Sequence, residues 1–516
     1  MTRRKRNWLV FLYCLFTAAV CLAVCSKSSF LYPINDWTDA NAYLSCGRGM
    51  LGGRVMYRDL YDHKGPLLYA LHALCCLVED GGFAGVFLLE VLCVGLFLTA
   101  CYQILSLYGA GRTAFLWQPV IAALVLTSVS FQQGDSAEEL CLPMLAWSLY
   151  GLLRWLRTRA PRRMETRELL LHGLLCGCVL WVKFTMLGFY AAWIVGTVLY
   201  LCVRRSPKAA FVSLGWFAAG IALATVPWVI YFGVNGAVGP WLKTYLYDNV
   251  FLYGGTTSGL AARGKAILRA GFYWFTDNWA YAVPMALGLL WFTFFGRSAR
   301  RGQKAAGAEA GRAAPPAVSG AEKAFMWAAL GFLALGVYIG GKSYAYYGLI
   351  LATFAPLGAL PLCGPVERLL AGRRAWKAAL ACALALGTGL FALAASPNTP
   401  DLLKPREDTM QYRVAALVNQ TPGATLLNYG FMDAGFYTAC DIAPSVKYFH
   451  QTNVHLQEML DEQTRYVTEG VTDYVVTRGR QPVAIADHYD LIATEKAPDG
   501  FWYQYVYLYR RRDLAP

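Results

Sequence analysis

Eleven apolar runs, most of them close to the length of a bilayer-spanning helix, constrain this chain more than any other feature of its sequence. A spanning helix needs about 20 mostly apolar residues. The runs lie at residues 8–25, 84–107, 113–131, 140–156, 169–182, 186–203, 210–232, 279–295, 324–339, 346–363 and 376–395. The sequence therefore predicts a mainly α-helical polytopic membrane protein. A further run, Pro66 to Val78, is too short to span and is predicted to be re-entrant or interfacial.

The composition supports this class and disfavours others. Hydrophobic residues make up 57% of the chain and charged residues only 15%, whereas soluble domains carry about a quarter charged residues. The net charge of +14 comes mainly from Lys and Arg clusters beside the apolar runs, which does not indicate a nucleic-acid surface. Most of the 15 Cys lie inside apolar runs, and no two CxxC motifs have zinc-ligand spacing, so neither a disulfide framework nor a zinc site is predicted.

The basic clusters also predict the orientation of the spans. With Arg3 to Arg6 in the cytoplasm, Arg112 and the segments 154–167, 204–208, 297–323 and 368–377 all fall on the inner side, as the positive-inside rule requires. The odd number of spans then places everything after Ala395 outside. The first run could be a cleaved signal peptide, but an uncleaved helix is favoured because it would tether the long loop that follows.

The predicted architecture has two domains. Residues 1–395 form the membrane domain, with a first outer loop at 26–82, a second at 233–278 and an Ala-, Gly-, Pro- and Arg-rich cytoplasmic linker at 297–323 that reads as disordered. Residues 396–516 form a small extracytoplasmic α/β domain. Its helices are expected near 410–419 and 454–469, and its strands near 425–431, 474–477, 491–494 and 503–509.

The first outer loop carries the densest set of reactive side chains. Its segment INDWTDANAYLSCGRGMLGGRVMYRDLYDHKGPLLY places Asp, Arg, His and Lys beside the short apolar run. Charges at a membrane boundary are costly unless they are paired or used. A carboxylate there could act as a general base, and Lys64 with nearby Arg could hold a phosphate. The alternative is a solvated loop whose charges pair with one another.

The order of these residues resembles a known family. Asp39, Gly47, Gly53 and YRDLYDHKGPLLY at 57–69 are similar to the first outer loop of bacterial glycosyltransferase family 39-like membrane proteins, relatives of the protein O-mannosyltransferases and of the aminoarabinose transferase of lipid A. The resemblance extends to QGDSAEELCLP at 133–143, WVKF at 181–184 and GGKSYAYYGLILATFAP at 340–356. Tyr346 stands where many relatives carry His.

This resemblance implies a GT-C-type fold, a polyprenyl-phosphate sugar donor and a first-loop Asp as the catalytic base. Asp39 matches that base by its spacing to Gly47, and Asp36 is an out-of-register second choice. Lys64 and Pro66 match the family's Lys and Pro element. The expected donor-phosphate residues are Lys64, His63, Arg58, Lys183, Lys342 and Tyr346.

Several of these assignments have an alternative. His63 could equally be a structural loop residue, and Lys183 could instead extend its ammonium group to the membrane interface. For Lys342 the same two roles, phosphate contact and extension to the interface, are equally supported. A divalent metal held by Asp39 and Glu138 is left open, because Lys and Arg could neutralise a phosphate alone. Glu139 is the other residue that fits the family's acidic position at the start of this helix.

The sequence thus predicts a membrane glycosyltransferase that moves a sugar from a polyprenyl-phosphate donor to an envelope acceptor on the outer face of the cytoplasmic membrane. The sugar stays open, as does the acceptor, which could be a polymer, a lipid or a protein. No nucleotide-binding loop is found, which fits a lipid-linked donor. The alternatives are a secondary transporter, which should show inverted repeats or midplane charges, and a non-catalytic envelope assembly factor.

Overall fold

All eleven predicted runs are helical in the computed structural model, which describes residues 2–109, 113–253, 259–295, 317–479, 485, 487–498 and 503–514. The corresponding elements are α1 (Arg3–Cys25), α4 (Ala84–Leu107), η1 with α5 (Ala114–Leu116, Trp117–Leu126), α6 (Ala137–Thr158), α7 (Thr166–Val182), α8 (Leu187–Val203), α9 (Pro207–Val234), α12 (Trp279–Phe294), α14 (Gly320–Tyr338), η4 with α15 (Ala345–Ala359, Leu360–Leu369) and α16 (Arg374–Ala395). A short 3-10 segment, η2 (Phe184–Met186), precedes α8. Arg112 and the predicted linker up to residue 316 lie outside the described residues.

The helices make this chain a multi-pass membrane protein. Among the described residues, seven helices are long and apolar enough to cross a membrane. The prediction of eleven spans remains a prediction, since α6 and α7 do not meet this criterion and α5 and α12 are shorter apolar helices. The run at Pro66 to Val78 forms only the 11-residue helix α3 (Pro66–Cys76), too short to span.

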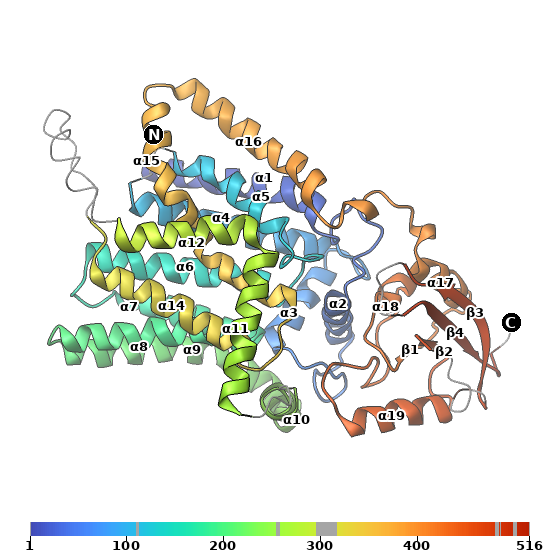
Figure 1. The fold of residues 1–516 in the computed structure, drawn as a ribbon. Helices are drawn as coiled ribbons and strands as arrows, with labels where there is room; N and C mark the ends of the chain where they lie inside the picture. Colours follow the sequence, from blue (N-terminus) through green and yellow to red (C-terminus); the bar gives the residue numbers. More distant parts are fainter. Residues whose placement is uncertain are drawn as a thin grey trace, which may run out of the picture.

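The helix ends alternate between the two ends of the bundle. At one end, Asn398, just after α16, donates a hydrogen bond to the backbone oxygen of Cys25, the last residue of α1. At the opposite end, Glu322 in the first turn of α14 accepts hydrogen bonds from Tyr108, just after α4, and from Arg157 in the last turn of α6. Figure 1 shows these helices side by side in one bundle. The end that contains Cys25 also carries the two long loops.

Local capping fixes where two of these helices begin. Ser136 accepts a hydrogen bond from the backbone N–H of Glu139 at the start of α6. Ser319 and Glu322 form a reciprocal capping box at the start of α14. Each cap satisfies N–H groups that have no partner within the helix. At α6 the cap also brings two Glu side chains to the loop end of the bundle.

The first loop contains a helix that the sequence pattern did not predict. Helix α2 (Thr38–Leu51) is buried along almost its whole length, and it lies between the bundle and the C-terminal domain (Figure 1). It packs on α3 through Gly47, where a Cβ atom would come within 2.7 Å of the backbone of His72 and Ala73. Only glycine permits this approach, so Gly47 fixes how α2 presents its side chains.

The second loop also folds into helices. It comprises α10 (Val238–Leu242), the π-helix η3 (Lys243–Leu252) and α11 (Leu260–Asp277). Figure 1 shows α11 running across the direction of the bundle helices. The second loop is therefore positioned to cover the junctions between bundle helices and the first loop.

The C-terminal region forms the small α/β domain that the sequence predicts. Its elements are η5 (Thr399–Asp401), η6 (Arg406–Asp408), α17 (Met410–Val418), β1 (Leu426–Tyr429), α18 (Phe436–Cys440), α19 (Gln457–Thr468), β2 (Tyr474–Thr477), β3 (Tyr489–Lys496) and β4 (Tyr505–Arg511). The sheet has the order β1-β2-β4-β3. Strands β1 and β2 are parallel, and the other pairs are antiparallel. The parallel pair requires a crossover, and the intervening chain contains α18 and α19.

Candidate functional site

Lys64 is held by its backbone at the junction of the first loop and the bundle. Its N–H donates to the Tyr69 hydroxyl at 2.8 Å, and its carbonyl accepts from the Tyr57 hydroxyl at 2.7 Å. The next residue, Gly65, lies against the end of α7, where a Cβ atom would come within 2.0 Å of the Trp181 carbonyl. A glycine is therefore required for the loop to reach α7, and this approach fixes the position of Lys64.

Asp39 lies beside Lys64 at the start of α2. Its Oδ2 accepts hydrogen bonds from the hydroxyls of Tyr43 at 3.1 Å and Tyr346 at 3.0 Å, and it lies 3.6 Å from Lys64 Nζ. Tyr43 stands one helical turn further along α2, and Tyr346 comes from η4. Two hydroxyl donors and an ammonium group therefore hold the Asp39 carboxylate in place.

Asp62 and His63 orient Lys64 from its other side. Asp62 Oδ1 lies 3.2 Å from His63 Nδ1, and Lys64 Nζ lies 3.5 Å from His63 Nε2. Burial and the Lys64 charge lower the pKa of His63 below its usual value. His63 is therefore neutral near pH 7, with its proton on the nitrogen that faces Asp62 and a lone pair toward Lys64. Burial opposes the charge of Lys64, but Asp39 and Asp62 outweigh it and raise the pKa of Lys64.

Lys183 supplies a second buried ammonium group at the end of α7. It forms an ion pair with Glu138 in the first turn of α6. Its Nζ also lies 3.6 Å from the ring centroid of Tyr347 and 5.1 Å from that of Tyr346. Cation–π contacts of this kind stabilise a desolvated ammonium. The Lys183 ammonium group is thus buried and held by Glu138 and Tyr347, and it does not extend into solvent.

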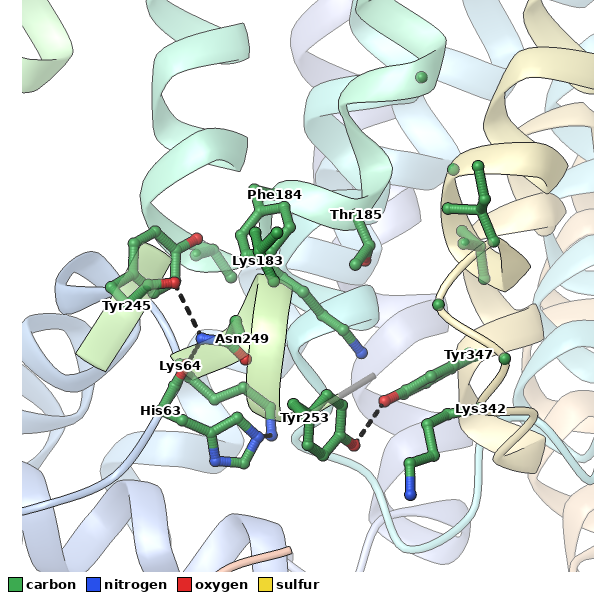
Figure 2. A pocket seen from close by; sticks show the side chains of 18 of the residues that line it. His63, Lys64, Lys183, Phe184, Thr185, Tyr245, Asn249, Tyr253, Lys342 and Tyr347 are labelled. Carbon is green, nitrogen blue, oxygen red and sulfur yellow. Dashed lines mark hydrogen bonds between the residues drawn. The ribbon is translucent and has the colours of Figure 1, made fainter. Parts of the chain in front are cut away.

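The second loop closes the site over the first loop. Asn249 Nδ2 donates to the His63 carbonyl at 2.6 Å, and the hydroxyls of Tyr253 and Tyr347 are hydrogen-bonded at 2.9 Å. Lys342, after α14, has its Nζ 5.5 Å from the ring centroid of Tyr253. Figure 2 shows Lys183 and Lys342 on opposite sides of the Tyr253 and Tyr347 pair.

These elements surround a cavity of about 430 Å³, which we call the cationic cavity. Its charged lining consists of Lys64, Lys183, Arg263 and Lys342, and no Asp or Glu is among the described residues that line it. The rest of the wall is largely apolar or small, with Val182, Phe184, Val250, Val337, Ile339 and the glycines 188, 336, 340 and 341. A cavity with basic groups on apolar walls suits a molecule that has an anionic head and an apolar tail.

Most of the sequence-predicted site residues come together here. His63, Lys64, Lys183 and Lys342 line the cationic cavity, while Asp39, Glu138 and Tyr346 contact its lysines. Two do not. Asp36 forms an ion pair with Lys27 at 2.9 Å, and Arg58 is exposed, with its guanidinium on Asp59 and on the Asn235 carbonyl.

The two carboxylates considered as metal ligands each face an ammonium group. Asp39 lies beside Lys64, and Glu138 is paired with Lys183. Among the described residues, no group of three or more His, Cys, Asp or Glu side chains could hold a metal ion. A divalent cation shared by Asp39 and Glu138 would have to displace both lysines, so these residues do not fit a metal as they stand.

The second loop supplies site residues that sequence reasoning missed, namely Asn249, Tyr253 and Arg263. The only signal for them was the density of Asp, Arg, Tyr and Gly in that loop. Nothing in the sequence indicated which of its residues would lie over the first loop. The sequence likewise did not indicate that the Tyr57 and Tyr69 hydroxyls would form hydrogen bonds with the backbone of Lys64.

Neither a family model nor a curated protein sequence matches this chain. Among solved structures, ArnT from Cupriavidus metallidurans bound to undecaprenyl phosphate aligns over 98% of both chains with 14% identity and a TM-score of 0.52. The apo form of the same protein aligns over 98% of both chains with 14% identity and a TM-score of 0.56.

A weaker match is the archaeal oligosaccharyltransferase AglB from Archaeoglobus fulgidus, solved with an inhibitory peptide and a dolichol-phosphate. It aligns over 92% of this chain and 70% of its own, with 12% identity and a TM-score of 0.44. ArnT, with TM-scores of 0.52 and 0.56 over 98% of both chains, shows the fold of this chain. This protein therefore has the GT-C-type fold of ArnT: a polytopic helical bundle with a small C-terminal α/β domain.

Proposed function

We propose that this protein is a membrane glycosyltransferase that moves a sugar from a polyprenyl-phosphate donor to an acceptor of the cell envelope. The observation that carries the proposal is the cationic cavity. Basic groups on apolar walls, with Asp39 held 3.6 Å from one of those basic groups, fit a lipid-linked phosphate donor beside a base.

The donor phosphate is assigned to the cavity lysines. Lys64 and Lys183 are fixed by the first loop, by Glu138 and by the Tyr347 ring, so their charges are already oriented. Preorganised cations stabilise the negative charge that grows on a departing phosphate. Lys342 and Arg263 complete the basic lining. The apolar wall would take the first part of the prenyl chain.

Asp39 is assigned as the general base. The acceptor oxygen attacks the anomeric carbon, the bond from that carbon to the phosphate oxygen breaks, and the acceptor proton passes to Asp39. The departing prenyl phosphate keeps the bonding electrons as negative charge, next to the lysines. Tyr43 and Tyr346 hold the carboxylate in place through hydrogen bonds to its Oδ2. Phosphate neutralisation by lysine requires no metal in this scheme.

The fold likeness supports the choice of donor class, since ArnT of the same fold has been solved with undecaprenyl phosphate bound. We further propose that the cavity faces the outer side of the membrane, with residues 1–395 as the catalytic membrane domain and 396–516 as an extracytoplasmic domain. The basic clusters of the sequence support this orientation. The acceptor could be a polymer, a lipid or a protein.

The test is turnover by the purified full-length protein in nanodiscs. Undecaprenyl-phosphate hexoses and pentoses, labelled in the sugar, are incubated with lipid, polysaccharide and protein fractions of the native cell envelope. We expect label in one fraction together with release of undecaprenyl phosphate, and neither with Asp39→Asn. Absence of transfer from every donor by the wild type would leave the transporter and assembly-factor alternatives.

A further inference from the structure

A second basic cavity, which we call the α11 cavity, adjoins the cationic cavity. It has a volume of about 540 Å³, and its charged lining consists of Lys265, Arg269 and Lys342, with no Asp or Glu among the described residues that line it. Gly341 and Lys342 line both cavities, whereas Arg263 lines the cationic cavity. Helix α11 therefore contributes basic side chains to two adjoining cavities.

The cations of the α11 cavity differ from the lysines of the proposed donor site. Lys64 and Lys183 each face a carboxylate. In the part of the chain that the structure describes, no carboxylate forms an ion pair with Lys265, Arg269 or Lys342. Three like charges around one cavity repel one another unless an anion lies between them. The α11 cavity is therefore suited to an anionic group.

The exposed surface of α11 indicates the source of this anion. Leu268, Phe272 and Phe275 are exposed, and their spacing places them in one apolar stripe along the helix. Lys265 and Arg269 lie three residues before Leu268 and Phe272, so the basic side chains border this stripe. A helix of this kind lies in the membrane interface, with its apolar side chains among the acyl chains and its basic side chains at the level of the headgroups.

The packing of α11 agrees with this position. Trp274 Nε1 donates to the Gly348 carbonyl of η4 at 3.1 Å, which holds one face of α11 against the bundle. Phe272 lies on the nearly opposite face, because successive helix residues are rotated by about 100°. The helix also runs across the direction of the bundle helices (Figure 1), as a helix that lies along a membrane surface would.

We propose that the α11 cavity binds the phosphate headgroup of an anionic phospholipid from the leaflet in which α11 lies, with the acyl chains along Leu268 and Phe272. A headgroup with a net negative charge, such as that of phosphatidylglycerol, is favoured over a zwitterionic one because the lining supplies three cations and no carboxylate. The lipid site is independent of the transfer reaction. Bound lipid would hold α11 and Lys342 beside the cationic cavity.

The measurement is binding of phosphatidylglycerol to the detergent-solubilised full-length protein, followed by native mass spectrometry, with phosphatidylcholine for comparison. We expect the wild type to bind its first phosphatidylglycerol at least about tenfold more tightly than phosphatidylcholine. The double variant Lys265→Gln with Arg269→Gln should lose about tenfold in phosphatidylglycerol affinity. The charge-conserving pair Lys265→Arg with Arg269→Lys should bind within about twofold of wild type, since each residue near an anionic headgroup acts mainly through its charge.

Two controls remove charge elsewhere. Arg204→Gln with Lys208→Gln takes the same two charges from the connection between α8 and α9, and neither residue lines the α11 cavity. Lys64→Met removes a cation that lines the cationic cavity and not the α11 cavity. We expect both controls to bind phosphatidylglycerol like the wild type.

Four results would overturn the proposal. The first is a wild type that does not prefer phosphatidylglycerol, and the second is an equal loss in the α11 pair and in the Arg204 and Lys208 pair, which would indicate general attraction between basic loops and anionic lipid. The third is a loss in Lys64→Met, which would place the lipid in the cationic cavity. The fourth is displacement of phosphatidylglycerol by inorganic phosphate, which would assign the α11 cavity to a soluble phosphate group.

Folding of the α11 variants is checked by their melting curves. Lys265 and Arg269 are exposed, so the double variant should melt like the wild type. Each single substitution should cause a smaller loss of phosphatidylglycerol affinity in the same direction, which keeps the test decisive if the pair fails to fold. Single variants that bind like the wild type would overturn the proposal in that case.

Discussion

Two groups of ionisable side chains lie at the same end of the bundle and differ in what they face. The cationic cavity places four basic side chains around open space. The buried carboxylate cluster, formed by Glu90, Asp135 and Glu139 with His72, is almost completely inaccessible, and none of these four residues lines the cationic cavity. The comparison teaches that the density of charged residues does not identify a reactive site; a set of basic side chains around a cavity, with Asp39 3.6 Å from one of them, does.

The internal contacts of the buried carboxylate cluster explain its closure. His72 Nε2 lies 3.0 Å from both oxygens of Asp135, and its Nδ1 lies 2.8 Å from the Leu68 carbonyl. The Asp135 backbone N–H donates to Glu90 at 2.9 Å and to Glu139 at 3.0 Å. A cluster whose polar atoms bind one another joins α3, α4 and α6. We therefore expect substitutions there to change stability, and substitutions at the cationic cavity to change donor use.

The largest effect should come from Asp39→Asn, which keeps size and hydrogen bonding but removes the base. General base catalysis contributes about 10² to 10⁴-fold, so turnover should fall by at least that lower factor, with melting behaviour close to wild type. Asp36→Asn is the matched control, because it removes one carboxylate of the same loop that is paired with Lys27 instead. Equal turnover for the two variants would show that the base lies elsewhere. Glu138 would then be the next candidate for the base.

Asp135→Ala should act on stability. It leaves His72 Nε2 without its acceptor, and breaking a buried pair in this way costs about 3–5 kcal/mol. We expect a clear drop in melting temperature and an unchanged donor KM in the protein that remains folded. Asp135→Asn, whose amide oxygen still accepts from His72, should lose less. A raised donor KM without a drop in melting temperature would place this cluster in the reaction.

The sequence predicted the bundle well because apolar length is a local property. Each of the eleven runs became helix, and the length of the run at Pro66 to Val78 predicted that α3 would be short. Helix α2 was missed because tertiary contacts stabilise it. Its polar residues Asn41 and Ser45 bind the C-terminal domain, and nothing in the local pattern distinguishes them from loop residues.

The candidate site could be predicted only where one loop carried the signal. Asp39 and Lys64 were found through the order of residues in the first loop, and the structure places them 3.6 Å apart. Asn249 and Arg263 reach the site because the second loop folds over the first. Such approaches between distant segments leave no mark in a single sequence.

Lys64→Met should weaken donor use without unfolding the protein. Hydrogen bonds to charged groups contribute about 1.5–3 kcal/mol, so the donor KM should rise by about tenfold or more. Lys27→Met is the control, since Lys27 is equally buried but paired with Asp36 and Asp401. The control should lower the melting temperature and leave the donor KM alone. An unchanged donor KM in Lys64→Met would remove Lys64 from the phosphate site.

The buried His450 of the C-terminal domain predicts a modest pH dependence of stability. Its pKa of about 4 lies below the usual value of about 6.5, so between these values the unfolded chain binds more protons than the folded protein. The contribution of His450 to stability should be constant above about pH 6.5 and should fall on acidification toward pH 4, by about 1 kcal/mol per pH unit. His63, whose pKa is also lowered, acts in the same direction. Melting curves of His450→Gln should show a shallower slope than wild type.

The smallest effect should come from removal of divalent metal. Asp39 and Glu138 are the two carboxylates nearest the cavity lysines, and each is occupied by an ammonium group. Lysine charges can neutralise the departing phosphate, so EDTA should leave turnover within about twofold, the range expected if no essential cation links these carboxylates. The assay uses saturating donor, so that indirect effects of EDTA on the lipid do not limit the rate. A different outcome would be a much larger loss of turnover in EDTA, with turnover restored by Mg²⁺, Mn²⁺ or Zn²⁺ in the wild type but not in Glu138→Gln. That outcome would place a cation between Asp39 and Glu138, and the lysines would then hold the site only before the metal binds.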